Sequence, residues 1–158
     1  MTGPQSDLGQ LPPLVAAMRE AIVSAAASGR FEALRIPIER NETPPLFARG
    51  ARRPPGYDPL VALRGRAFDA GGREIMGLLQ AVLAQPYVRI TRGPSVSFGW
   101  PAFGYVAPPL PMREEDIIAR WACVRFADLG GATAAGGPLI QRLEIGADGT
   151  WHLLLAAP

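Results

Sequence analysis

The stretch from residue 73 to residue 107 constrains the fold more than any other, because its apolar pattern changes period at one proline. Between Arg73 and Gln85 the apolar residues recur at helical spacing: Ile75, Leu78, Leu79 and Val82. Pro86 ends this pattern, and two segments of extended character come after it, at residues 87–91 and 95–106. A helix with a broad apolar face, followed by two strands, predicts a helix packed on an antiparallel sheet.

The remaining elements are short and joined by turns, as 17 prolines and 18 glycines suggest. Periodicity and cap residues predict helices at residues 12–28, from Asp58 to near Gly65, and near 113–125, the last with a strand at 121–126 as its alternative. We expect Pro37 to end a helical turn that begins at Phe31. Residues 37–57 should form a long connection anchored by Leu46 and Phe47.

The clearest hairpin pairs residues 139–145 with residues 150–156, after a glycine-rich loop at residues 128–138. Leu143 and Ile145 alternate with Arg142 and Glu144, which predicts that one face of this hairpin is in water. The sum is an α+β fold in which helices pack on one face of an antiparallel sheet of about four strands. A chain of 158 residues fits a single domain at 12–158, preceded by a flexible arm at residues 1–11.

Composition excludes several classes of function. The net charge is +2, all 16 basic residues are arginine, and no basic stripe is evident, so we expect no nucleic-acid partner. We interpret the one local cluster, Arg49, Arg52 and Arg53, as a solvated loop, with an anion-binding patch as the alternative. One cysteine and one histidine predict neither a metal site nor a cofactor.

No apolar run is long enough to span a membrane, and the first residues lack a signal-peptide pattern. The native compartment is therefore open: periplasmic if an exported precursor was trimmed, cytoplasmic otherwise.

Candidate binding residues fall into three groups. The polar residues Glu39, Asn41 and Glu42 lie on the proline-rich connection, and loops of that kind often carry sites. His152 lies on the last strand, where a surface histidine is the alternative to a general base. The third group is aromatic and belongs to either the core or a binding surface: Trp100, Phe103, Tyr105 and Trp151.

Three motifs occur in the order seen in a group of small, mostly exported bacterial proteins of unknown function. They are Pro86-Tyr87-Val88, Trp100-Pro101-Ala102-Phe103 and the segment from Ile145 to His152. The chain resembles that group over most of residues 12–158, although its final strand lacks the group's Phe-x-Ala-Gly-Asp type of ending. The resemblance implies a fold and an envelope setting, and no catalytic residue.

A looser likeness is to the cone-shaped NTF2-like fold, through residues 29–34 after the first helix and the final Asp-Gly-Thr-Trp strand. That resemblance implies a pocket between helices and a curved sheet. We therefore expect a non-enzymatic module that binds a small molecule or another protein. The alternative is an NTF2-like small-molecule binder, or a small hydrolase or isomerase, that uses His152 or a carboxylate of the 39–42 loop.

Overall fold

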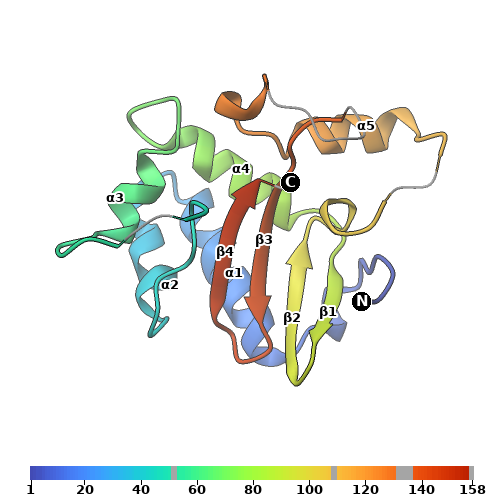
Figure 1. Ribbon diagram of the computed structural model, residues 1–158, viewed down its shortest axis with the longest axis horizontal. Coiled ribbons are helices and arrows are strands. Elements are labelled where there is room, and N and C mark those ends of the chain that lie inside the picture. Colours follow the sequence, from blue (N-terminus) through green and yellow to red (C-terminus); the bar gives the residue numbers. More distant parts are fainter. Residues whose placement is uncertain (51–52, 108–109, 131–136, 157–158) are drawn as a thin grey trace.

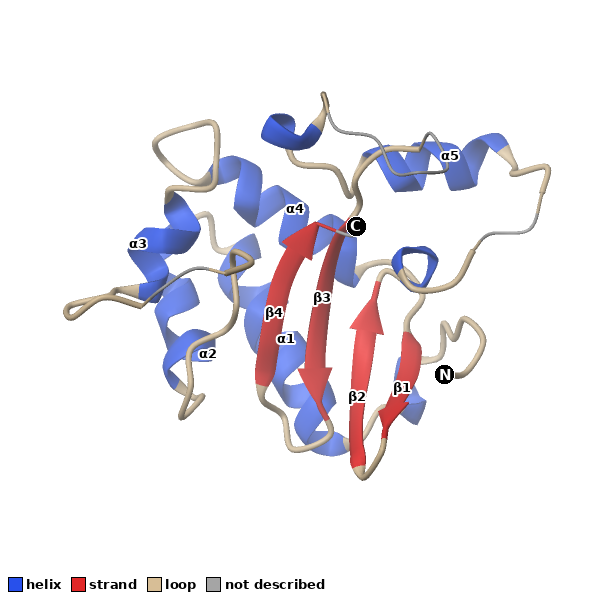
Figure 2. Ribbon diagram, viewed as in Figure 1, coloured by secondary structure: helices blue, strands red, loops and turns tan. Residues whose placement is uncertain are grey.

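The computed structural model describes residues 1–50, 53–107, 110–130 and 137–156. Four antiparallel strands form one open sheet whose order follows the chain, and helices cover one of its faces (Figures 1 and 2). The strands are β1 (Val88–Arg92), β2 (Ser95–Trp100), β3 (Gln141–Gly146) and β4 (Trp151–Ala156). The predicted α+β arrangement is confirmed.

Five helices and four short 3₁₀ turns make up the rest of the regular structure in the described chain. The helices are α1 (Pro13–Ala27), α2 (Arg35–Glu39), α3 (Pro59–Arg64), α4 (Arg73–Leu83) and α5 (Glu114–Trp121). The 3₁₀ turns are η1 (Leu8–Gln10), η2 (Phe31–Leu34), η3 (Ala102–Gly104) and η4 (Phe126–Asp128). The expectation that Pro37 ends a helix is wrong, because Pro37 lies in the first turn of α2, where a backbone N–H has no helical partner to lose.

Side chains and glycine fix where the helices begin. The Asp58 carboxylate accepts the backbone N–H groups of Leu60 and Val61, as its position before Pro59 predicts. At α4, the N-cap is Gly72 in the left-handed region, with φ of 72°. The neighbouring Asp69 supplies the missing acceptor for the first turn.

The core lies between the inner face of the sheet and the helices α1 and α4, which run behind the sheet in Figure 1. Strand register places Trp100 opposite Leu143 and Phe98 opposite Ile145, and all four side chains belong to one buried cluster. The apolar stripe of α4 meets this layer, and Leu79 and Val82 are fully buried. This contact joins the helices of the domain to its sheet.

The outer face of the sheet is more deeply buried than the sequence predicted. Glu144 was expected in water, but this residue is only 3% exposed, because residues 102–106 fold over this face. They cover Val88 and Ile90 with Ala102, Tyr105 and Val106. The predicted strand at 95–106 therefore ends at Trp100, and the rest of it becomes a cover for the sheet.

The first residues, predicted to be a flexible arm, make backbone contacts with the sheet in the structure. Thr2 donates its backbone N–H to Arg89, and Gln5 exchanges two backbone hydrogen bonds of 2.8 Å with Tyr87, so the segment lies along the outer edge of β1. Leu11 is buried in the main core. The loop predicted at residues 128–138 lies partly outside the described residues.

The α4 contact generates a matched pair of substitutions. Leu79→Ala leaves a cavity in the core and should lower the free energy of unfolding by about 2–5 kcal/mol. Gly77→Ala lies on the exposed side of the same helix with no atom within 4 Å of the new Cβ, and should raise it by about 0.5–1 kcal/mol. Urea unfolding measures both. Equal and small effects would show that α4 is not packed as described.

Candidate functional site

The two tryptophans among the candidate residues belong to the core. Trp100 and Trp151 are both fully buried, and the ring of Trp100 lies 5.4 Å from that of Tyr87. The indole N–H of Trp151 donates to the carbonyl of Leu153 at 2.9 Å. Both rings are enclosed by core side chains, so these two aromatics hold the sheet against its helices.

Of the three polar residues predicted on the proline-rich connection, one bonds to the sheet and two are exposed. The Asn41 amide donates to the Trp151 carbonyl at 3.0 Å and accepts the Trp151 N–H at 3.2 Å. Asn41 thus continues the edge of β4, where Leu46 forms a parallel bridge with Leu153. Glu39 is exposed and paired with Arg35 at 3.2 Å, and Glu42 is exposed. The three polar residues therefore do not converge on a site.

The Tyr105 ring packs on the outer face of the sheet and covers it. Its hydroxyl donates to the Leu143 carbonyl at 3.2 Å, and burial raises its pKa. Only glycine fits beneath the ring, because a Cβ at Gly99 would lie 2.6 Å from it. Arg142 stacks above, with its guanidinium carbon 5.1 Å from the ring centre.

A buried carboxylate paired with an exposed arginine lies beside this ring. Glu144 pairs with Arg92 at 2.5 Å and accepts the Ser97 hydroxyl at 2.6 Å. Burial opposes ionisation of Glu144, but the hydrogen bonds from Arg92 and Ser97 outweigh it, so its pKa is lowered. His152 is exposed near the rim of this cluster, above Gly146, as the surface alternative for this histidine supposed.

An apolar groove lies at the end of the sheet, between residues 102–107 and α5. We name it the Phe103 groove, and its volume is about 480 Å³. Phe103 is half-buried and lines it, so one of the predicted binding residues does face a cavity. The other lining residues are Pro4, Gln85, Pro86, Ala102, Val106, Ala107, Arg113, Asp116, Ala119 and Arg120.

Charge at the groove comes from α5. Arg113 holds both oxygens of Asp116, at 3.0 and 3.2 Å, and this pairing lowers the pKa of Asp116. Arg120 lies over the Phe103 ring at 5.2 Å and donates to the Phe103 carbonyl at 3.5 Å. Arg120 makes no ion pair with a described carboxylate. Its positive charge therefore lies beside the apolar wall of the groove without a carboxylate partner in the described chain.

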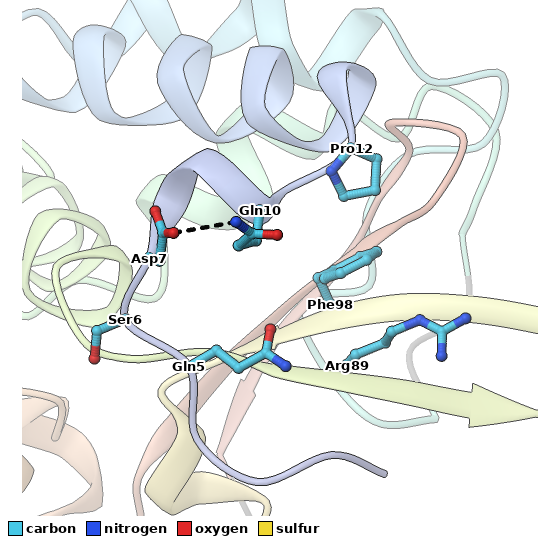
Figure 3. Close-up of a pocket in the computed structure, with 7 residues that line it drawn as sticks. All are labelled: Gln5, Ser6, Asp7, Gln10, Pro12, Arg89 and Phe98. Atoms are coloured by element: carbon cyan, nitrogen blue, oxygen red, sulfur yellow. Dashed lines mark hydrogen bonds between the residues drawn. The ribbon is translucent and has the colours of Figure 1, made fainter.

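A second hollow, of about 490 Å³, lies under the first residues of the chain (Figure 3). Phe98 and Pro12 form its apolar side, and Gln5 and Arg89 stand around it. The carboxylate in its lining belongs to Asp7, which already accepts the backbone N–H of Gly9 and the side-chain amide of Gln10. The hollow is more open than the Phe103 groove, and two of its polar side chains, Asp7 and Gln10, bond to each other.

Sequence reasoning missed Arg120 and the α5 wall of the groove. The signal in the sequence lay just after Arg113, where acidic residues are followed by Ile117, Ile118 and Trp121, but the sequence could not show that α5 buries none of its side chains. Among the described residues, no group of three histidine, cysteine, aspartate or glutamate residues could hold a metal ion. No helix in the same part of the chain is long and apolar enough to cross a membrane.

The Glu144 pair predicts a pH-dependent stability. Because the folded pKa of Glu144 is lowered, its contribution is present above the unfolded value of about 4.3 and is lost as the pH falls through the folded value. Glu144→Gln should therefore lower the free energy of unfolding by about 1–3 kcal/mol at pH 7, with the difference shrinking below about pH 4. Denaturant titrations across this range measure it. Glu42→Gln, at an exposed carboxylate, is the control, and a difference that widens with acid would contradict the assignment.

The comparisons with known proteins add no family to this geometry. No family model, no curated protein and no solved structure matches the chain.

Proposed function

We propose that the protein is a non-enzymatic binding module whose Phe103 groove takes an apolar small molecule that carries an anionic group. The observation that carries the proposal is the position of Arg120, a guanidinium without a carboxylate partner among the described residues, on the aromatic wall of the groove. A volume of about 480 Å³ lies in the range of small-molecule sites. The apolar wall would hold the body of the ligand and Arg120 its charge.

The walls of the groove are well placed for binding. Ala102 is buried and its backbone N–H donates to the Pro86 carbonyl at 2.7 Å, which fixes the floor to the end of α4. The opposite wall is α5, which buries none of its side chains. A ligand between a fixed floor and a lightly packed helix gains contacts on both sides and needs little rearrangement of the core.

The same residues favour binding over catalysis. The one carboxylate in the lining, Asp116, accepts two hydrogen bonds from Arg113, and its lowered pKa makes it a poor proton acceptor. His152, Glu39 and Glu42, which the enzymatic alternative requires, do not line the groove. The cone-shaped alternative requires long strands in the proline-rich connection at residues 37–57, and there the described residues contribute a single bridge at Leu46.

Titration with the fluorescent anion 8-anilinonaphthalene-1-sulfonate tests the proposal. Phe103→Ala removes the aromatic wall and should weaken dye binding about tenfold. Arg120→Gln removes the cation and should weaken it about five- to tenfold. Phe68→Ala and Arg40→Gln are the matched controls, because Phe68 is 68% exposed away from the groove and Arg40 is exposed at the end of α2.

Displacement of the dye by competing ligands distinguishes the contribution of charge to binding from that of apolar contact. Decanoate should displace it more effectively than 1-decanol, and Arg120→Gln should abolish that preference. Circular dichroism shows whether each variant remains folded. Equal weakening in Phe68→Ala and Phe103→Ala, or an unchanged preference in Arg120→Gln, would overturn the proposal.

A further inference from the structure

A cleft of about 350 Å³ at the end of β4 is lined by three arginines from distant parts of the chain. Arg49 comes from the proline-rich connection, Arg66 comes after α3, and Arg125 comes after α5. Phe47 and Leu155 provide apolar surface beside them. We name this cavity the arginine cleft. It lies apart from the Phe103 groove, with which it shares no lining residue.

The two inner guanidinium groups are held by the scaffold. Arg66 donates to the Leu154 carbonyl at 2.5 Å and to the Gln141 side chain at 3.2 Å. Arg125 holds both oxygens of Asp128 at 3.0 Å and donates to the Arg66 carbonyl at 3.1 Å. Each group retains N–H donors beyond those used in these bonds. Their planes are thus fixed before any ligand arrives.

The lining of the cleft contains three arginines and no carboxylate, and the two nearest carboxylates, Asp128 and Glu74, lie behind it. Asp128 is the carboxylate paired with Arg125, and it also accepts the Gln141 amide at 2.7 Å. Both oxygens of nearby Glu74 accept backbone N–H groups, from Phe68 and Phe126. Burial and then the charge of Arg125 lower the pKa of Arg66 to about 10, against the opposing charges of Asp128 and Glu74, so Arg66 is still a cation at neutral pH.

A fourth arginine extends the positive surface. Arg53 and Arg66 line an adjoining cavity, and the Arg53 guanidinium lies 6.0 Å from the centre of the Tyr57 ring. Arg49 makes no ion pair with a carboxylate in the described part of the chain. Two members of the arginine cluster on the proline-rich connection are thus brought beside two arginines from later parts of the chain.

We propose that the arginine cleft is a binding site for a small oxyanion, the phosphate or carboxylate group of a ligand whose apolar part contacts Phe47 and Leu155. Planar guanidinium groups match the paired oxygens of these anions, and Arg66 and Arg125 are already oriented. Arg49, on an exposed loop, lines the same cleft. The anion adds negative charge to a lining that has three arginines and no carboxylate.

Calorimetric titration of the full chain at low ionic strength tests this, with inorganic pyrophosphate as the phosphate probe and succinate as the carboxylate probe. Wild type should bind at least one probe saturably with one site, and the stronger probe identifies the preferred anion. Arg49→Gln should weaken that binding about five- to tenfold. Arg66→Lys keeps the charge but loses the planar fork, and should weaken it by a similar factor.

Arg30→Gln is the control, because Arg30 is exposed far from the cleft in sequence and lines neither the cleft nor the adjoining cavity. Thermal unfolding with and without the probe provides a second readout, since a bound anion should raise the melting temperature of wild type more than that of Arg49→Gln. Absence of saturable binding of both probes, or equal weakening in Arg30→Gln, would overturn the proposal. Arg120→Gln should leave pyrophosphate or succinate binding unchanged, which separates this cleft from the Phe103 groove.

Discussion

Burial of the α4 stripe against the inner face of the sheet is the interaction on which the other features depend. Leu79 and Val82 of α4 share one buried cluster with Trp100 of β2 and Trp151 of β4. Aromatic and aliphatic side chains of this size contribute most of the apolar area that a small domain removes from water. Because the helices occupy the inner face, residues 102–106 are left to cover Val88 and Ile90 on the outer one. The Phe103 groove forms where that cover meets α5.

Local patterns predicted the elements that local physics determines. The period of α4, the Asp58 cap and the pairing of the last two strands each depend on neighbours within a few residues, and each appears in the structure as expected. The strand predicted at 95–106 failed for another reason, because the path of the chain after Trp100 is decided by the sheet face that it covers. Burial of Glu144 likewise depends on Arg92 and Ser97, which lie on other strands and cannot be paired with it from one sequence.

The same distinction applies to the sites. Phe103 was a sequence candidate because it is aromatic, and it does line a cavity, but Trp100 and Trp151 carried the same signal and are core residues. Arg66 and Arg125 gave no signal at all, since a single arginine between apolar residues is ordinary. Their importance arises only when the fold brings them to one end of β4, where the fixed backbone carbonyls and Asp128 orient both groups. Sites assembled from separate elements are therefore the part that sequence reasoning reaches last.

Amide hydrogen exchange tests the central claim most directly, because it measures which elements share the core. The amides of α4, β2 and β3 should exchange only through global unfolding, whereas those of α5, which buries no side chain, should exchange through local opening at a lower free energy. An apolar anion in the Phe103 groove should raise protection in α5 first. Protection of α5 equal to that of α4 without ligand, or fast exchange in α4, would contradict a core built on the α4 stripe and a groove walled by a loosely held helix.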